Sequence, residues 1–434
     1  MALSNAPLNV VVVGGGLAGL TAAAYLARGG AVVSLFEQAP ALGGRAATQH
    51  HDGYRLNRGI HALYSGSSAS SVFAELQIAY TGKPPKTIHA LRHGRFHLAP
   101  IGTMSLLTTD LLSPLDKLEV LRLFTRMARL NPADFRDMSV QQWLNANISR
   151  PRVRQLMTAN AWTFVYSSAL DLVSADVFIL KTQLGLKHPV IYIDGGWETL
   201  IEGLRGVAQQ AGAHIRTAAH VSGLEYGDGR VKAVVLRDGT AVQADAVIVA
   251  TSARAAGSLV GAPLREIVET LVPAQVASLD VALRRLPNSR WTVVQDLEHP
   301  RFMSTQSLYS RVAPEGGAVI YAFKQLDPRQ PGDPHADERD LQELLDTAQP
   351  GWREVVETRQ FLPRIEAVGM LPMARTHGYA GRPRFRVPGV SNLYVAGDWV
   401  GEGFLADPSL SSAREAARHI LTEQHSRALA GRTG

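Results

Sequence analysis

One segment near the N-terminus constrains the fold of this chain more than any other part of it. Residues 10–13 are four consecutive valines, and residues 14–19 follow them with four glycines. Residues 20–27 are rich in helix formers, and a second apolar run at residues 31–36 ends at Glu37. A strand, a glycine turn, a helix and a second strand in so few residues predict a parallel βαβ unit. We therefore expect an α/β fold in which helices cover a parallel sheet.

The glycine turn predicts a binding site for a dinucleotide. Gly14 permits a tight turn, Gly16 lets the main chain approach a pyrophosphate, and Gly19 lets the helix pack closely on the strand. The first helical residues, Leu17 and Ala18, bring free N–H groups and a partial positive charge to the phosphates.

Glu37 supports the same interpretation from the second strand. It lies 18 residues after Gly19, where an acid at the strand end accepts hydrogen bonds from ribose hydroxyls. The alternative is a glycine-rich turn between a strand and a helix that binds no ligand. Because both strands and the acid accompany the glycines, we expect dinucleotide binding.

Two further motifs indicate which dinucleotide to expect. Residues 41–46 read Ala-Leu-Gly-Gly-Arg-Ala, and residues 53–61 carry further Gly, Arg and His. Near the other end, residues 392–399 lead from an apolar run into a Gly-Asp turn. In this order the motifs resemble those of the flavin amine oxidase and phytoene desaturase superfamily, most strongly at residues 10–61 and 392–417. The resemblance implies an FAD-dependent oxidoreductase with a Rossmann-like FAD-binding domain.

The resemblance also implies which residues contact FAD. Gly44 and Arg45, together with Asp398, then lie at the pyrophosphate and the ribityl chain. The start of the last helix faces the pyrimidine edge of the flavin, where its partial positive charge stabilises the reduced ring. The full set of implied cofactor contacts is Gly14, Gly16, Leu17, Ala18, Gly19, Glu37, Gln38, Gly43, Gly44, Arg45, Val221, Gly397, Asp398, Asp407, Ser409 and Leu410.

Several of these residues also have a plain structural interpretation. Arg45 can form a surface ion pair, Asp398 can cap a turn, and Val221, expected to offer its main chain to the adenine, can be a core residue. In the last helix, Asp407 is expected as the N-cap and Pro408 as the first helical residue. Relatives usually carry small Gly or Ala residues there, so the sequence leaves open which N–H groups face the flavin.

The motifs divide the chain into two interleaved units. Residues 1–66, 191–261 and 366–434 carry the FAD motifs and are expected to form a discontinuous FAD-binding domain. Residues 67–190 and 262–365 then form an α+β substrate-binding domain.

The first of these substrate-domain segments contains a marked helix start, with Ser113 as the N-cap and Pro114 as the first helical residue. Arginines line one face of this helix, so it either lies on an anionic membrane or packs in its domain with a solvated basic face. The expected apolar face consists of Val120, Leu121, Leu123, Phe124, Met127, Ala128 and Leu130.

Composition excludes several classes of function. The chain has no cysteine, which excludes disulfides, thiolate metal centres and a cysteine-tethered cofactor. We expect no metal site. The net charge is +6 without a long Lys/Arg block, so we expect no nucleic-acid partner. We expect a cytoplasmic protein that acts on a small apolar substrate, with peripheral membrane contact as an open alternative.

An FAD enzyme needs few catalytic side chains, because the flavin performs the redox chemistry. The resemblance places His61 near the substrate or the isoalloxazine ring; the alternative is a hydrogen-bonded loop histidine. Amine oxidases of the superfamily usually have a lysine in the strand that matches residues 278–285, which contain none here, and Lys324 is a remote substitute.

The missing lysine favours a phytoene-desaturase-like reaction, in which a hydride leaves an apolar substrate for flavin N5 and a C=C bond or a related oxidation product forms. One alternative is an amine or amino-acid oxidase that produces hydrogen peroxide. Another is a non-catalytic lipid-binding escort protein on the same fold.

Overall fold

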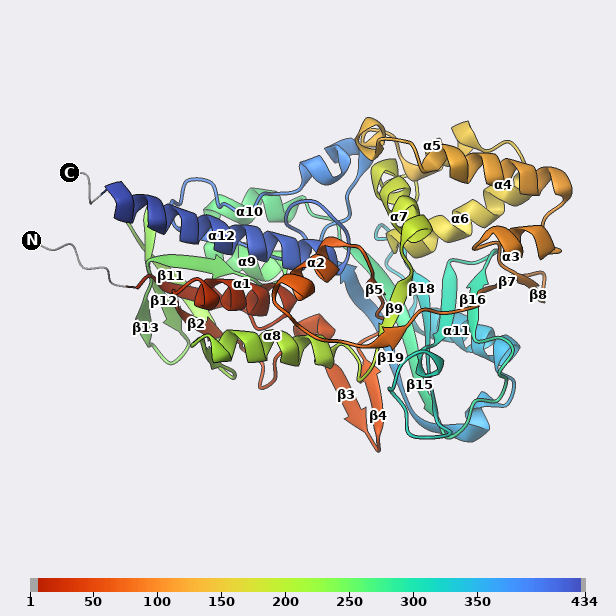
Figure 1. Ribbon diagram of the computed structural model, residues 1–434, viewed down its shortest axis with the longest axis horizontal. Helices are drawn as coiled ribbons and strands as arrows, with labels where there is room; N and C mark the ends of the chain where they lie inside the picture. The colour runs from red at the N-terminus through yellow and green to blue at the C-terminus, as the bar shows by residue number, and fades with distance from the viewer. Residues whose placement is uncertain (1–6, 431–434) are drawn as a thin grey trace, which may run out of the picture.

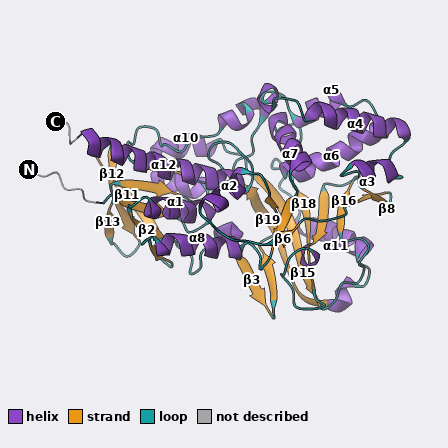
Figure 2. Ribbon diagram, viewed as in Figure 1, coloured by secondary structure: helices purple, strands orange, loops and turns teal. Residues whose placement is uncertain are grey.

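The computed structural model describes residues 7–430, which form two lobes (Figure 1). The first lobe contains both ends of the described chain. In the second lobe, helices lie above a large sheet (Figure 2).

The first lobe is built on a five-stranded sheet with the order β10-β2-β1-β14-β20. All four strand pairs are parallel. Strands from the beginning, the middle and the end of the chain therefore present their carboxyl ends at one edge, where α/β folds bind ligands. The strands are β1 (Asn9–Val13), β2 (Val32–Phe36), β10 (His214–Arg216), β14 (Ala246–Val249) and β20 (Leu393–Val395).

The valines of β1 are buried on both faces of this sheet. Val10 and Val12 pack beneath α1, α8 and α12, whereas Val11 and Val13 pack with α9 and a three-stranded sheet. Successive side chains of a strand point to opposite faces, so a doubly covered strand needs an unbroken apolar run. The helices are α1 (Leu17–Arg28), α8 (Glu198–Gln210), α9 (Ala253–Val260), α10 (Ala262–Glu269) and α12 (Ala406–Ala430), and the small sheet consists of β11 (Val221–Gly227), β12 (Arg230–Leu236) and β13 (Ala241–Gln243).

The second lobe is built on a seven-stranded sheet with the order β19-β15-β18-β17-β16-β7-β8. One of its faces packs against α11 (Pro334–Ala348). Five helices share a separate core above the sheet. The strands are β7 (His89–Arg92), β8 (Arg95–Leu98), β15 (Ala274–Leu283), β16 (Val293–Asp296), β17 (Arg301–Thr305), β18 (Ala318–Gln325) and β19 (Val356–Val368), and the helices are α3 (Thr103–Thr108), α4 (Pro114–Met127), α5 (Val140–Asn147), α6 (Pro151–Val165) and α7 (Ala175–Lys187).

Two small sheets and one helix complete the fold. β3 (Thr48–His51) pairs with β4 (Tyr54–Asn57), and β9 (Val190–Ile193) pairs with β5 (Leu63–Tyr64) and β6 (Gly82–Lys83). α2 (Ser68–Glu75) packs in the core of the first lobe through Val72 and Phe73. The boundary expected from the sequence, at residue 66, would assign α2 to the other unit. Because residues up to Ile78 belong to the core of the first lobe, we propose that the first unit extends to Ile78.

The structure confirms the expected parallel sheet covered by helices, and it corrects the expected packing of α4. Ser113 caps this helix as predicted, because its Oγ accepts a hydrogen bond from the Asp116 N–H. However, Leu121 and Ala128 were wrongly placed on the buried face, since both are exposed. The helix packs through Val120, Leu123 and Met127 instead, which form a narrower stripe than the sequence pattern indicated.

Candidate active site

The turn after β1 is so tightly packed that two of its positions accept only glycine. Gly14 has φ +107°, and a Cβ there would lie 2.5 Å from the carbonyl oxygen of Ala250. A Cβ on Gly19 would lie 1.8 Å from the carbonyl oxygen of Gly14. The first turn of α1 therefore lies directly against the end of β1, as the glycine spacing predicted.

The opposite side of this turn is open. A Cβ on Gly16 would meet only the carbonyl oxygen of Gly43, at 3.8 Å, and one on Gly44 would meet only Gly16, at 3.9 Å. Gly16 and Gly43 form a parallel β-bridge, so the two glycine motifs lie side by side. No side chain caps α1, whose first residues are Leu17 and Ala18. The result is a wall of bare main chain at a helix N-terminus, which suits a pyrophosphate.

Glu37 lies at the carboxyl end of β2, beside this wall. One of its carboxylate oxygens accepts the N–H of Gly15 at 2.6 Å, and the other accepts the N–H of Ala39 at 2.8 Å. A carboxylate oxygen has a second lone pair, so both oxygens can still accept ribose hydroxyls. The two main-chain bonds hold the acid in position.

The segment before β11 passes next to Glu37. The Ala219 N–H donates to the Glu37 carbonyl at 2.8 Å, and the half-buried Val221 follows two residues later. The structure therefore brings the segment of Val221 next to Glu37, while the contact of Val221 with adenine stays a prediction. Gln38 is exposed, and its side-chain oxygen lies 3.1 Å from the His220 ring.

The N-terminal and C-terminal motifs meet in an ion pair. The Arg45 guanidinium donates to both oxygens of Asp398, at 2.8 and 2.6 Å. The Gly369 N–H donates to the same carboxylate at 2.6 Å. Burial alone would raise the pKa of Asp398, but Arg45 outweighs that effect and the pKa lies below its ordinary value. Asp398 is therefore an anion, and its ion pair with Arg45 joins two residues that lie 353 positions apart in the chain.

This ion pair bears on both structural alternatives raised by the sequence: the half-exposed Arg45 does form an ion pair, and its contact with FAD stays a prediction. Asp398 bonds to Gly369 and Arg45 rather than capping its own turn. The partner of Arg45 is 4% exposed, whereas the Arg45 side chain is 47% exposed, so half of the guanidinium arm stays available to a ligand. Gly397 is held by its N–H, which donates to Ser412 Oγ at 3.1 Å.

The start of α12 differs from the prediction. The helix begins at Ala406, so Asp407 is inside the first turn and is not the N-cap. Its carboxylate instead accepts the N–H of Ala69, at the beginning of α2, at 3.1 Å. Ser409 and Leu410 are buried. This tertiary bond to α2 explains the shift, since a sequence pattern only considers bonds within the helix.

His61 lies at the junction of the two lobes. Its Nδ1 is 2.9 Å from the Gly59 carbonyl, and its ring lies edge-on to Trp197 with 5.0 Å between the centroids. Burial lowers the pKa of His61 below its ordinary value, so the ring is neutral at neutral pH. The hydrogen bond to Gly59 agrees with the loop-histidine alternative, and a contact with flavin or substrate stays a prediction.

Five aromatic rings gather on the sheet face opposite α11. Tyr166 stacks on Phe323 with 5.6 Å between the centroids, and Phe302 lies at the same distance from Phe323. Ile60, the neighbour of His61, packs against this group. We call Tyr166, Tyr192, Phe302, Tyr309 and Phe323 the aromatic cluster.

Lys181 is a residue that the sequence analysis missed. It lies on α7, is 2% exposed, and its Nζ is 3.4 Å from the centroid of the Tyr64 ring. Its Nζ has no hydrogen-bond partner within residues 7–430. Burial lowers its pKa to about 8, and the Asp407 carboxylate partly opposes that shift. Nothing in the local sequence distinguishes this lysine from a surface lysine.

Asp280 on β15 is a second buried group that the sequence did not single out. Its carboxylate accepts hydrogen bonds from Ser278 Oγ at 2.5 Å, Gln360 Nε2 at 2.9 Å and the Gly59 N–H at 3.0 Å. Burial raises its pKa to about 7, although these three donors favour the anion. Asp280 thus holds the loop that carries His61.

Lys324, the remote substitute for the missing lysine, is not available as a free amine. Its Nζ pairs with Asp337 at 2.8 Å and also with Asp340, beneath α11. Both partners lie on α11, the helix that covers the face of the sheet opposite the aromatic cluster. This part of the prediction was wrong, because the sequence did not show which acids face the strand.

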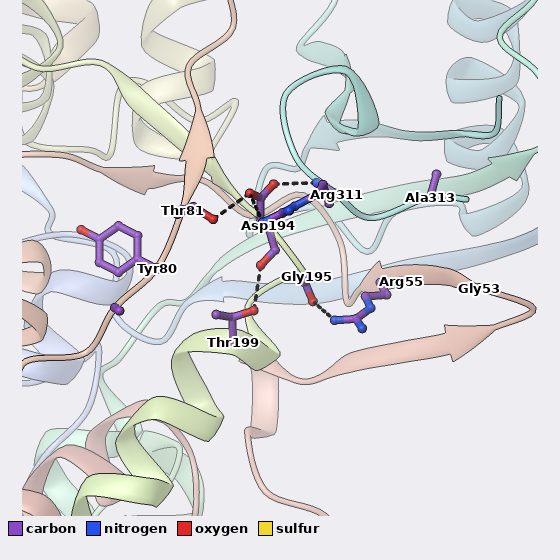
Figure 3. Close-up of a pocket in the computed structure, with 10 residues that line it drawn as sticks. Gly53, Arg55, Tyr80, Thr81, Asp194, Gly195, Thr199, Arg311 and Ala313 are labelled. Atoms are coloured by element: carbon purple, nitrogen blue, oxygen red, sulfur yellow. Dashed lines mark hydrogen bonds and ion pairs between the residues drawn. The ribbon is translucent and has the colours of Figure 1, made fainter. Parts of the chain in front are cut away.

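A hollow of about 550 Å³ lies beside the β3–β4 hairpin and the start of α8 (Figure 3). Asp194 at its centre accepts hydrogen bonds from Thr81 Oγ1 and the Arg311 N–H, both at 2.7 Å. Thr199 Oγ1 donates to the Asp194 carbonyl at 2.7 Å. The polar groups in this hollow are hydrogen-bonded to one another. None of the predicted cofactor residues lines the hollow, so it is distinct from the expected FAD site.

The described residues hold neither a cluster of metal ligands nor a membrane-spanning helix. Within residues 7–430, no three His, Cys, Asp or Glu side chains are arranged to hold a metal ion. In the same residues, no helix is both long and apolar enough to cross a bilayer.

Comparison with known proteins gives one family match and several distant relatives. Residues 17–329 match the family described as flavin containing amine oxidoreductase. The chain is 23% identical over 282 residues to a phytoene desaturase of Fusarium fujikuroi, covering 57% of this chain and 49% of that protein. It is 27% identical over 286 residues to a 4,4'-diaponeurosporene oxygenase of Staphylococcus aureus, covering 55% of each. The chain thus spans about half the length of the curated relatives it matches.

Solved structures share the fold. A crystal structure of an oxidoreductase from Methanosarcina mazei aligns with a TM-score of 0.76 at 20% identity, covering 95% of this chain and all of that one. The resemblance predicted from the ordered motifs is therefore confirmed.

Proposed function

This chain belongs to the family of flavin-containing amine oxidoreductases, and from that premise we propose that it is an FAD-dependent oxidoreductase that removes a hydride from an apolar small molecule. The expected product carries a new C=C bond or results from a related oxidation. When bound, FAD supplies the two-electron acceptor for this chemistry.

The residues present fit FAD. The open glycine wall at Gly16 and Gly44 suits the pyrophosphate, because no side chain separates the main chain from a ligand there. Glu37 has lone pairs for the ribose hydroxyls, and the side chain of Arg45 stays half exposed although its guanidinium is paired with Asp398. The buried Ser409 and Leu410 at the start of α12 are assigned to the pyrimidine edge.

One observation carries the choice of an apolar substrate: the aromatic cluster adjoins the loop that carries His61. Ile60 contacts this cluster, and Asp280 ties the same loop to β15 through Gly59. Aromatic side chains bind hydrocarbon by apolar burial and exclude water from the reacting C–H bond. The relatives named for phytoene and 4,4'-diaponeurosporene, both hydrocarbons, support this choice.

The test is anaerobic reduction of the flavin. The purified yellow protein is mixed with apolar isoprenoids without oxygen, and loss of flavin absorbance is followed. We expect bleaching by an apolar substrate, and slower bleaching with Phe302→Ser at equal flavin content. Phe96→Ser is the matched control, because Phe96 stacks on Trp291 outside the aromatic cluster. A flavin that no apolar compound reduces, but an amine does, would overturn the proposal.

Lys181 favours a second candidate, an amine or amino-acid oxidase. It supplies a buried amine near Asp407 that has no hydrogen-bond partner among the described residues, although it lies on α7 and not on the strand where such enzymes usually carry their lysine. An amine oxidase releases hydrogen peroxide with amines under air. A silent peroxide assay across a panel of amines and amino acids would exclude this function.

The proposal includes a cytoplasmic location and a peripheral contact with a membrane, since apolar substrates partition into lipid.

A further inference from the structure

An unusual share of the exposed large apolar side chains belongs to one short segment. Three lie at or in α3, and three lie in the first half of α4. Contiguous exposed apolar patches on soluble proteins mark interaction surfaces. The six residues and their exposed fractions are Ile101 (54%), Met104 (72%), Leu107 (64%), Leu115 (61%), Leu118 (41%) and Leu121 (54%), and we call them the α3–α4 patch.

The two helices present these residues together. Leu115, Leu118 and Leu121 are spaced three apart, so they form one stripe along α4. That stripe lies away from the face through which Val120 and its neighbours pack. Lys117 Nζ on α4 donates to the Leu107 carbonyl at 2.7 Å, which fixes the end of α3 beside the start of α4 (Figure 1).

Basic side chains continue the same stripe. Arg122, Arg126 and Arg129 are exposed, and none of them forms an ion pair within the described residues 7–430. The acids of α4 are already engaged: Asp116 pairs with Arg150, and Glu119 accepts the N–H of Ser149 at 2.8 Å. The exposed face of α4 therefore combines leucines with uncompensated positive charge.

A second hollow, of about 500 Å³, opens close to this patch. Its lining includes Lys83, Lys86 and Arg290, and also Tyr309 of the aromatic cluster. The hollow adjoins β7, and the Ala99 N–H donates to the Ile88 carbonyl at 2.9 Å, two residues before the patch begins at Ile101. The lining of this hollow therefore combines basic side chains with one ring of the aromatic cluster.

We propose that the α3–α4 patch docks on an anionic lipid surface. Leucine and methionine side chains insert at the boundary between headgroups and acyl chains, while the arginines pair with lipid phosphates and carboxylates. A second copy of this chain suits the patch less well, because a two-fold interface brings identical patches together and sets Arg122 and Arg126 against their own copies.

This inference deepens the proposed function by naming the surface and the lipid, and it rests on the membrane contact proposed there. The experiment needs no substrate, so its failure leaves the oxidoreductase proposal standing. The flavin-loaded full chain is sedimented with phosphatidylcholine vesicles, with or without phosphatidylserine, at low ionic strength. We expect binding to the vesicles that contain phosphatidylserine and at least tenfold weaker binding to the neutral ones.

Two double variants separate the apolar and the charged contributions. Arg122→Gln with Arg126→Gln should weaken binding about thirtyfold, from about fivefold for each cation near the surface. Met104→Ser with Leu118→Ser should weaken it about a hundredfold, because two buried apolar side chains are lost.

Arg237→Gln with Arg265→Gln makes the same charge change at two exposed arginines of the first lobe, and Val32→Ser replaces a 40% exposed apolar residue there. These controls should bind like the unmodified chain. Equal binding to both vesicle types, or no loss in either α3–α4 variant, overturns the proposal. A dimer in gel filtration that Met104→Ser with Leu118→Ser abolishes, with no vesicle binding, assigns the patch to a second copy and also overturns it.

Discussion

Asp280 allows a direct test of whether burial sets the charge of a residue near the candidate site. Its carboxylate holds the loop that carries Gly59 and His61, and a single proton decides whether it is charged. The residue is 0% exposed, and burial raises its pKa from the ordinary value of 3.8 to about 7. Asn has the shape of the protonated acid, and its amide can donate to Ser278 Oγ while its carbonyl accepts from Gly59. We therefore choose Asp280→Asn as the perturbation.

The direction of the effect follows from proton linkage. Between pH 4 and pH 7 the folded chain holds a proton on Asp280 that the unfolded chain has released, so the free energy of unfolding falls as the pH rises. One pKa unit corresponds to about 1.4 kcal/mol. Asp280 therefore removes about 3 kcal/mol of stability between pH 5 and pH 8, and the Asn variant lacks this loss.

The assay is the thermal midpoint of unfolding measured from pH 5 to pH 8. For a unit of about 200 residues, 1 kcal/mol corresponds to about 2–4 °C, so the unmodified chain should lose about 6–12 °C more than Asp280→Asn over this range. Infrared difference spectra should also show a protonated carboxyl band that titrates near pH 7 and is absent from the variant.

The matched control is Asp116→Asn. Asp116 is also almost inaccessible to solvent, at 3% exposure, but hydrogen bonds from Ser113 and Arg150 outweigh its burial and lower its pKa to about 2. Its removal should leave the slope between pH 5 and pH 8 unchanged. Parallel pH profiles for the unmodified chain and Asp280→Asn would falsify the argument that burial dominates at this site.

Three further predictions concern the cofactor site and its surroundings. Glu37→Ala should lower the flavin content of the purified protein and Asp398→Ala should lower it further, because the second change also removes the two-bonded partner of the Arg45 guanidinium and leaves it only Glu366; equal, undiminished flavin absorbance in both would contradict the site map. Gly19→Ala should yield little soluble protein, because its Cβ would lie 1.8 Å from the carbonyl oxygen of Gly14; a soluble, yellow variant would show that the turn is less tight than described. Lys181→Met should be more stable than the unmodified chain at pH 7 by up to about 3 kcal/mol, since burial lowers the pKa from 10.5 to about 8. The folded state therefore gains stability as the pH rises from 8 to 10.5, and a difference in thermal midpoint that does not shrink over that range argues against an unpartnered amine.

The sequence predicted the first lobe well because local rules dictate it. Four valines in a row need cover on both faces, and only glycine is compatible with the contacts at Gly14 and Gly19. Those requirements involve residues close together in the chain, so they are visible as a pattern. The same holds for Ser113, whose capping bond spans three residues.

The sequence also predicted that both ends of the chain contribute to one site, but only through the order of its motifs. The ion pair between Arg45 and Asp398 joins residues 353 positions apart, and no local rule selects that partner. The wrong prediction of Asp407 as an N-cap has the same origin. Its carboxylate accepts a hydrogen bond from the N–H of Ala69 in α2, which lies 338 residues away in the chain.

Short-range sterics and periodicity are enough to predict the glycine-lined turn, the acid at Glu37 and the parallel sheet from the amino-acid sequence. Tertiary structure alone decided the protonation of Asp280 and Lys181 and the exposure of Leu121. Burial and charge at a residue depend on which distant segments pack against it. A short stretch of sequence does not show which distant segments pack against a residue. Burial by those segments is what shifts the pKa of Asp280 and of Lys181.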